Sequence, residues 1–253
     1  MLPGDILRGV ALSLAEQTAL RASQTLSAAG IEHVIVKGLA VALTLRPERT
    51  FRDVDLIVSW ADFWPARRLL REAGFRSSPG QTTLHSAALG SPLRASPDLD
   101  LQGWLGYPLL PRGGLVALLR DARWVPAGAG SIPVPGAIDL ACLAALYAVR
   151  DRLRPETAPL IADLRRVLAL HGAEPVEARA RELGLERYVA MALDPIYHPW
   201  SARLRALDER YPRAMSALPA ALAGGWRGLV SALIAVVLLA AEHAVRRWVD
   251  RHD

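Results

Sequence analysis

One stretch limits the fold of this chain more than any other: VIVKGLAVALTLRPERTFRDVDLIV, residues 34–58. It contains two short apolar runs, separated by a helical pattern and an arginine-rich corner. The second run carries Asp53 and Asp55, two residues apart. Residues i and i+2 of a strand project on the same face, so both carboxylates would point the same way from an otherwise apolar strand. We therefore expect this strand to border a polar site.

Two adjacent carboxylates need a positive charge, because they repel each other and burial makes the pair costly. Mg²⁺ would supply that charge most directly, since it prefers carboxylate, water and phosphate oxygens. The alternative is a solvated strand end, because Asp-x-Asp often occurs by chance. The context favours a phosphate site: Lys37 and Gly38 open a helix, whose N-terminus attracts anions, and Arg49 and Arg52 add donors.

Strand and helix patterns alternate in the first half of the chain. They predict helices over residues 5–29, 38–45 and 61–73, and strands over 31–36, 54–58, 84–89 and 99–105. A Gly/Pro-rich segment, PAGAGSIPVPG (126–136), predicts a hairpin or linker. Further helices are expected over 137–150, 158–170, 175–183 and 185–193. We thus expect an α/β domain over residues 1–125 and a helical domain over residues 137–253.

The order of these features resembles the DNA polymerase β-like nucleotidyltransferase superfamily. Within it, the chain is similar to the uncharacterised nucleotidyltransferases, which carry Leu-Lys-Gly, a short helix and Arg-x-x-x-Asp-x-Asp-Leu-Leu-Val. The matching residues are Lys37, Gly38, Arg49, Asp53, Asp55, Leu56 and Val58, and the clear resemblance covers about residues 31–105. It implies an α+β fold, with a nucleotidyltransferase-type mixed sheet and helices followed by a mainly helical second half.

The resemblance also implies a third carboxylate on a later strand. Asp100 in SPDLDLQGWL matches it, and Asp98, on the same strand face, is the fallback. Gln102 stands where the family often has His, and Trp104 lies close to Asp100 in the sequence. A weaker similarity places a family helix around Asp163.

The activity implied by the resemblance is transfer of NMP from an NTP, with ATP the expected donor, and release of pyrophosphate. Asp53, Asp55 and Asp100 would be the catalytic residues and the ligands of Mg²⁺, with Mn²⁺ as an alternative ion. Lys37, Gly38, Arg49 and Arg52 would hold the nucleotide. The acceptor stays open between a small molecule, a peptide, a protein and an RNA end.

A second hypothesis is a non-catalytic nucleotide-binding or assembly module on the same fold, since fold does not fix function. It is favoured by Leu39, which follows Gly38 where many superfamily members have Ser or Gly. A serine hydroxyl that would contact the triphosphate is missing at that position, and Lys37 is expected to supply charge instead. Retention of all three acids favours the enzyme.

Composition narrows the partners and the compartment. The net charge is +5, from 30 basic and 25 acidic residues, and Lys37 is the single lysine. Such an arginine bias is typical of GC-rich coding, so nucleic acid is not the expected partner. Cys142 is the single cysteine, and the N-terminus lacks a signal-peptide pattern, so we expect a cytoplasmic protein. His171 and His198 show no metal-ligand spacing.

An apolar segment near the C-terminus, GLVSALIAVVLLAA (228–241), has no polar face. It is shorter than the roughly 20 residues that a spanning helix needs. A buried helix or a homo-oligomer contact is the expectation. Trp226 and Trp248, each beside arginines, leave membrane contact as the alternative.

Overall fold

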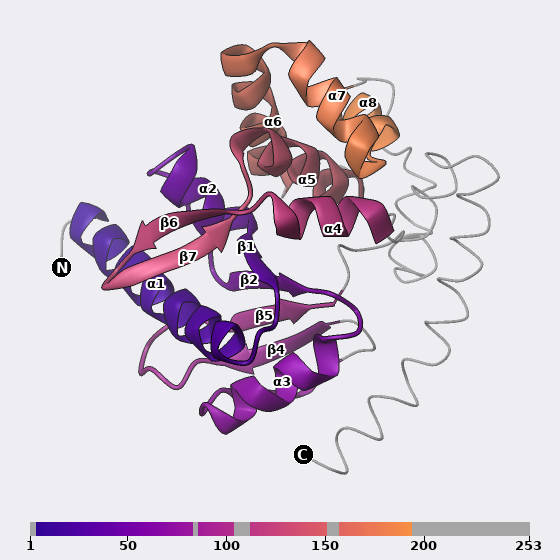
Figure 1. Cartoon of the computed structure of the whole chain (residues 1–253). Helices are drawn as coiled ribbons and strands as arrows, with labels where there is room; N and C mark the ends of the chain where they lie inside the picture. Colours follow the sequence, from indigo (N-terminus) through magenta and orange to yellow (C-terminus); the bar gives the residue numbers. More distant parts are fainter. Residues whose placement is uncertain (1–3, 83–85, 104–111, 151–156, 194–253) are drawn as a thin grey trace, which may run out of the picture. The chain divides into compact units, whose positions relative to one another are not determined.

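A computed structural model of the chain describes residues 4–82, 86–103, 112–150 and 157–193. These residues form mixed α+β structure, which confirms the expected fold class. The chain divides into two compact units. The first contains a five-stranded sheet, the helices before and within it and a two-stranded hairpin, and the second is helical (Figure 1).

The sheet of the first unit has the order β1-β2-β5-β4-β3. The strands are β1 (His33–Val36), β2 (Val54–Val58), β3 (Arg76–Thr82), β4 (Ser86–Gly90) and β5 (Leu99–Gln102). β2 runs parallel to β5 and antiparallel to β1, and all five residues of β2 are buried. The bounds of β2 are those that the sequence predicted, whereas β3 was not predicted.

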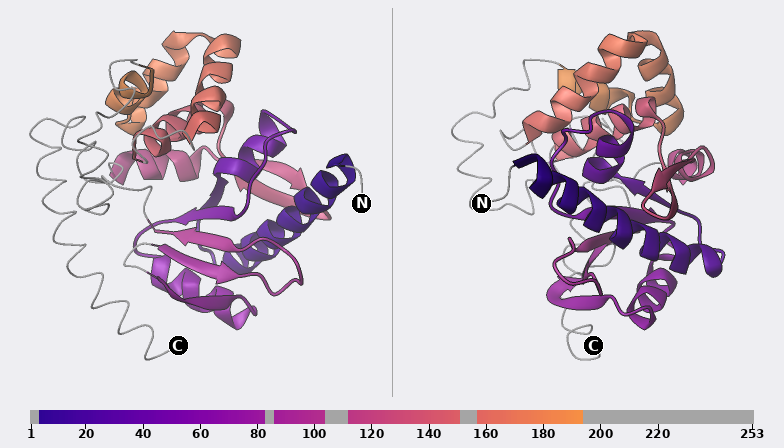
Figure 2. Two further views of the ribbon diagram at one scale, coloured as in Figure 1. Left: turned by 180° about the vertical axis from the view of Figure 1, so that it is seen from behind. Right: turned by 90° about the vertical axis from the view of Figure 1, so that its left-hand side faces the viewer.

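Helices α1 (Gly4–Ala28) and α3 (Phe63–Glu72) pack against each other and against the sheet. Figure 2 (left) shows the sheet from the side away from α1. The buried apolar residues of α1 recur every three or four positions and are mostly small: Ala15, Ala19, Ala22 and Leu26. This spacing places them on one stripe of the helix. Their small side chains let the α1 backbone approach the strands closely.

A hairpin of β6 (Arg123–Ala127) and β7 (Gly130–Val134) occupies much of the Gly/Pro-rich segment. The alternatives of hairpin and linker are thereby settled in favour of a hairpin. Gly128 has a positive φ of 55°, which glycine adopts without steric cost. β7 packs beside β1 and α1, so the hairpin belongs to the first unit.

Helix α4 (Arg112–Arg120) precedes this hairpin in the chain, and four helices follow it: α5 (Ala137–Arg150), α6 (Ala158–His171), α7 (Ala173–Leu183) and α8 (Glu186–Leu193). The bounds of α5 are those predicted, whereas α4 was not predicted. α5 contacts α6, α7 and α8, and its residues from Leu140 to Val149 are all buried. It is therefore the core of the second unit. Arg179 on α7 ties the two helices by donating to Asp139 on α5, Nε to Oδ1 at 2.6 Å.

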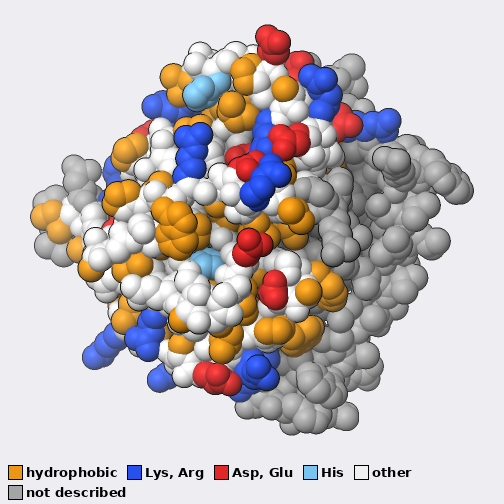
Figure 3. Space-filling model, in the orientation of Figure 1, with side chains coloured by type: hydrophobic (Ala, Val, Ile, Leu, Met, Phe, Trp, Pro, Cys, Tyr) orange, Lys and Arg blue, Asp and Glu red, His pale blue; other side chains and the backbone are white. Residues whose placement is uncertain are grey.

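Charged and apolar side chains are interspersed on the face of the molecule shown in Figure 3. The large apolar residues that are about half exposed include Ile6, Leu7 and Val10 of α1. Among the helices described, none has the length and hydropathy to cross a membrane. The apolar segment 228–241, with Trp226 and Trp248, lies outside the described residues.

Candidate active site

Neighbouring strands bring two of the predicted carboxylates together. β2 and β5 are parallel, and their register pairs Asp55 with Asp100. Paired residues of adjacent strands project on the same side of a sheet. The two carboxylates therefore stand side by side in the sheet, although they are 45 positions apart in the sequence.

Asp55 is the most buried of the three acids, with 2% of its surface exposed. Burial raises its pKa to about 6; the charge of Lys37 opposes this shift, and the charges of Asp53 and Asp100 add to it. Asp53 itself is exposed, just before the first residue of β2. All three carboxylates thus lie close enough to interact, and Asp55 is the one whose charge is hardest to maintain.

Gln102 connects two of the acids. Its Nε2 donates to Asp55 Oδ1 at 3.1 Å and to Asp100 Oδ2 at 2.6 Å. The side chain is 4% exposed, two residues beyond Asp100 on the same face of β5. Sequence reasoning treated Gln102 only as a departure from the family pattern. Its spacing from Asp100 was the signal that could have placed it in the site.

Lys37 is also part of the site. Its Nζ donates to Asp55 Oδ1, and its side chain is 20% exposed. The register of the sheet explains the contact, because Val36 pairs with Asp55 and Lys37 follows it directly. Lys37 has a φ of 54°, in the left-handed region that side chains other than glycine rarely adopt. The sequence predicted phosphate contacts for Lys37, whereas its ammonium group contacts a carboxylate in this structure.

Lys37 also begins helix α2 (Lys37–Thr44). The residue before it, Val36, provides no side-chain cap, so the first amides of α2 have no side-chain acceptor at this position. Amides at a helix N-terminus attract anions. The start of α2 is therefore suited to a phosphate group beside the acids.

Gly38 has a packing reason to be glycine. A Cβ built on it would lie 2.4 Å from the Cβ of Phe51, a distance that real atoms do not reach. Gly38 is buried in α2, and its φ is not in the positive region. The close approach of Phe51 is thus sufficient to explain this glycine. Phosphate contact by Gly38 stays a prediction.

The two predicted arginines lie in the segment between α2 and β2. Arg49 Nη1 donates to the backbone oxygen of Thr50 at 2.8 Å. Arg52 is exposed and lines a cavity of about 440 Å³, together with Leu14 of α1 and Ser96. The sequence did not predict that Arg52 faces α1. Nucleotide contacts by either arginine stay predictions.

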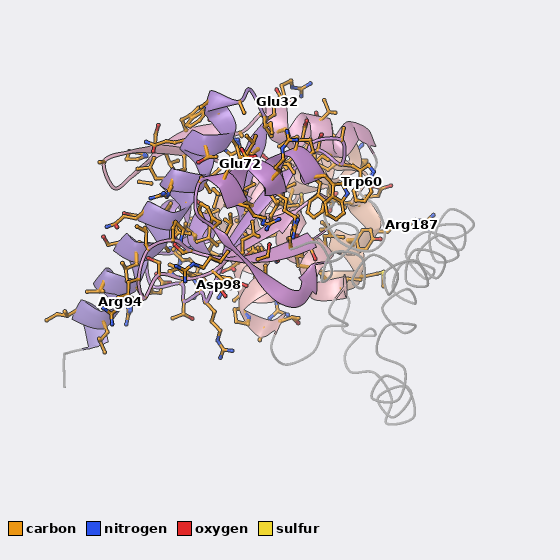
Figure 4. All side chains as sticks on the ribbon, turned by 90° about the horizontal axis from the view of Figure 1, so that it is seen from below. Glu32, Trp60, Glu72, Arg94, Asp98 and Arg187 are labelled. Carbon is orange, nitrogen blue, oxygen red and sulfur yellow. The ribbon has the colours of Figure 1, made fainter. Side chains whose placement is uncertain are left out.

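Asp98, the fallback for the third acid, has a different environment. Its side chain is exposed, in the loop before β5 (Figure 4), and its Oδ1 would lie 3.8 Å from a Cβ on Gly90. Its backbone oxygen accepts from the amide of Val54 at 2.9 Å. Asp100, by contrast, acts on the pKa of Asp55 and shares a donor with it. The geometry favours Asp100 as the third acid.

The donor set suits a hard divalent cation in kind, since the charges of Asp53 and Asp100 both act on the pKa of Asp55, and one amide bridges Asp55 and Asp100. Within the described ranges, however, no three His, Cys, Asp or Glu side chains stand as a group that could hold a metal ion. Asp55 Oδ1 receives N–H donors instead. The predicted ligands therefore have the right chemistry for a divalent cation, but N–H donors of Lys37 and Gln102 contact Asp55 in this arrangement.

The other residues named from the sequence belong to the second unit or fall outside the described residues. Asp163 is buried on α6 in the second unit, and His171 is exposed at the end of that helix. Trp104 and His198 fall outside the described residues.

Comparison with protein families decides what kind of chain this is. The profile of a family described as uncharacterised nucleotidyltransferase matches residues 11–196, well over half of the sequence. The chain belongs to this nucleotidyltransferase family. The match includes every predicted site residue, from Lys37 to Asp100, and most of the second unit. None of the curated proteins compared with this nucleotidyltransferase matches it.

Solved structures resemble the nucleotidyltransferase at low identity. The antibiotic-resistance factor ANT(2'')-Ia has 16% identity, and the comparison covers 70% of this chain and 94% of that one with a TM-score of 0.48. An antigenic nucleotidyltransferase-like protein from Paracoccidioides brasiliensis has 16% identity, with coverage of 81% and 92% and a TM-score of 0.49.

Proposed function

We propose that this nucleotidyltransferase moves NMP from an NTP, ATP in the first instance, to an acceptor group and releases pyrophosphate. The observation that carries the proposal is the pairing of Asp55 with Asp100 across β2 and β5, with Lys37 and Gln102 donating into the same place. A buried acid with a second acid in register beside it costs stability, and a structural role does not require the two acids. A reaction that binds cations and phosphate groups at these acids does require them.

The residues of the site would have different roles in this reaction. Asp53, Asp55 and Asp100 would hold Mg²⁺ or Mn²⁺, which when bound neutralises the triphosphate and stabilises charge on the reacting oxygens. Asp100 lies beside Asp55 and would accept the proton of the acceptor hydroxyl. Lys37 and the first amides of α2, at Gly38, would contact phosphate oxygens.

Arg49 and Arg52 would add further phosphate contacts, on the argument from their chemistry alone. The acceptor is proposed to be a small molecule, a peptide or a protein, not nucleic acid. The proposal places the reaction in the cytoplasm, since the single cysteine, Cys142, is a buried free thiol.

A specific observation favours the second candidate, a non-catalytic nucleotide-binding module. Asp55 is already satisfied by Lys37 and Gln102, and the described residues offer no assembled group of metal ligands. Such a site could persist without catalysis. The two candidates differ in whether a nucleotide is ever attached to an acceptor.

The test is incubation with each labelled NTP, Mg²⁺ and a cell extract, followed by mass spectrometry for products enlarged by one nucleotide. We expect a product with the wild type and none with Asp100→Asn. Binding of ATP that depends on Mg²⁺, with no product from any extract, would favour the binding module. Absence of ATP binding in both proteins would remove both candidates.

A further inference from the structure

We propose that Lys37 and Gln102 are positioning residues that clamp Asp55 in a metal-free arrangement, so that a divalent cation binds tightly only once a nucleotide has drawn Lys37 away. The inference deepens the proposed function and rests on it. Neither the family match nor the reaction class assigns a role to Gln102 or a contact between Lys37 and an acid.

The first step of the argument is the occupation of one oxygen. Asp55 Oδ1 accepts from two donors at once, Lys37 Nζ and Gln102 Nε2. The same Gln102 nitrogen holds Asp100 Oδ2 at 2.6 Å, so one amide fixes the spacing of two carboxylates. A cation that coordinated Asp55 through Oδ1 would have to displace both donors. We call Lys37, Asp55, Gln102 and Asp100 the clamp.

The second step is the electrostatic balance of the clamp. Asp55 is 2% exposed, so its charge is stabilised by its neighbours more than by water. Lys37 supplies a compact positive charge, the kind of charge that a metal ion would otherwise supply. Within the clamp the lysine therefore competes with the cation for Asp55.

The third step is the backbone of Lys37. Its φ of 54° is an unfavourable conformation for a residue with a side chain. Such conformations persist where surrounding contacts enforce them, and they concentrate at switch regions and active sites. Lys37 also stands at the start of α2, where the amides lack a side-chain cap. A triphosphate bound there would offer the ammonium group of Lys37 more negative charge than Asp55 does.

When Lys37 moves onto phosphate, Asp55 loses the ammonium group as its positively charged partner. The affinity of Asp55 for a divalent ion then rises. Binding linkage is reciprocal, so the cation in turn raises the affinity for the nucleotide. The clamp thus predicts weak binding of either ligand alone.

The experiment separates the two ligands. Mn²⁺ is titrated without nucleotide, followed by electron paramagnetic resonance of free Mn²⁺, and ATP is titrated in EDTA by calorimetry. In Lys37→Met we expect Mn²⁺ affinity to rise at least about fivefold, the lower end of typical coupling between two ligands, while ATP affinity in EDTA falls. Opposite shifts are informative, because a damaged fold would weaken both.

Gln102→Met provides the second variant, since it keeps similar volume and loses the amide donors. Mn²⁺ affinity should rise here too, with ATP affinity in EDTA unchanged. Lys37→Arg keeps the charge and should return both affinities toward the wild type. Arg68→Met is the matched control: it also replaces one cation by Met, on an exposed side chain of α3, and should change neither affinity.

Unchanged or weaker Mn²⁺ binding in both Lys37→Met and Gln102→Met would overturn the clamp. That result is independent of catalysis, because the wild type would still transfer nucleotide in the assay above. Loss of the proposed function is equally distinct. A wild type without transfer activity would still bind Mn²⁺ more weakly than Lys37→Met.

Discussion

Substitution of Asp53 tests how the charge of this residue affects the pKa of Asp55 and the stability of the fold. The raised pKa of Asp55 means that its ionisation opposes folding: this destabilisation is absent below the unfolded pKa of 3.8, develops as pH rises to about 6 and then stays constant. Asp53→Asn removes one charge that raises this pKa. We expect the pKa of Asp55 to fall, followed by carbon-13 NMR of its carboxyl group.

The same variant should lose nucleotide transfer. Because Asp53 is exposed, we expect Asp53→Asn to raise the free energy of unfolding at pH 7.5 by no more than about 1 kcal/mol. Urea denaturation at pH 7.5 and at pH 3.5 checks the sign, since the gain should vanish at the lower pH. An unfolded variant whose folded remainder kept full specific activity would make the acid pair structural.

His33 gives a second prediction at the level of one side chain. Burial lowers its pKa, although a hydrogen bond to the backbone oxygen of Ile31 opposes this shift. The carbonyl of Ile31 accepts from Nδ1 at 2.8 Å, so in the neutral ring Nε2 accepts from the hydroxyl of Ser23 at 2.7 Å. Protonation of His33 would place a proton on Nε2, which could then no longer accept the hydrogen bond from the Ser23 hydroxyl.

The stability associated with neutral His33 is therefore complete above pH 6.5, the unfolded pKa, and is lost as pH falls toward the lower folded pKa. The free energy of unfolding should decline in this range by at most about 1.4 kcal/mol per pH unit, the limit for one proton. His33→Gln should be less stable overall and lose this decline. A wild-type profile with the same slope as His33→Gln would contradict the assignment.

The glycine at position 38 in helix α2 has two possible reasons, packing against Phe51 and contact with phosphate, and one substitution can separate them. Gly38→Ala would place a methyl group against the Cβ of Phe51, which cannot move without the backbone. We expect a loss of about 1–3 kcal/mol in unfolding free energy without nucleotide, as for other overpacked sites. Gly9→Ala is the control, because nothing lies within 4 Å of its added Cβ and it lies inside α1.

Replacement of glycine in a helix interior stabilises by about 0.5–1 kcal/mol, so Gly9→Ala should shift in the opposite direction. Thermal and urea denaturation of the two variants measure the difference. If Gly38→Ala were as stable as the wild type and only ATP binding were lost, the phosphate explanation would replace the packing one.

Cys142 reports on the molecule as a whole, because it is the single cysteine. It is fully buried on α5, where burial raises its pKa to about 12, with the charge of Asp139 as a further cause. Its thiol donates to the backbone oxygen of Val176 on α7. A thiol reagent at pH 8 should therefore react only through opening of the helical unit.

The chain offers a matched probe for the first unit: Ala22→Cys in a Cys142→Ala background, at a fully buried position of α1. Each unit has a core of its own, so we expect the two thiols to become reactive at different urea concentrations. Coincident midpoints would show that the whole chain opens in one step.

Much of this architecture was predictable from local pattern. The bounds of β2 and α5 follow from mainly apolar runs, each interrupted by one aspartate, that end at turn or charged residues. β3 was missed because its sequence, RSSPGQT, is polar and contains Pro and Gly, and α4 because two glycines open it. β3 is a strand because it pairs with β4, and its own sequence carries no apolar pattern that would predict this.

The candidate site divides in the same way. Asp53, Asp55 and Asp100 were predicted from their spacing and from the resemblance, and the register places Asp55 and Asp100 side by side. The contact of Lys37 with Asp55 depends on the antiparallel pairing of β1 with β2, which no local pattern reports. The positive φ of Lys37 was equally inaccessible, because propensity would assign that conformation to glycine or asparagine.

That conformation gives position 37 two competing evolutionary optima. Left-handed backbone costs a residue with a side chain about 1–2 kcal/mol and costs glycine almost nothing. Selection for stability alone would thus replace lysine, and only continued use of its ammonium group would retain it. A descendant that abandoned its chemistry would drift toward glycine or asparagine at this site, while its buried strands stayed recognisable. Among relatives of this chain, the residue at position 37 would then mark which copies still carry out a reaction.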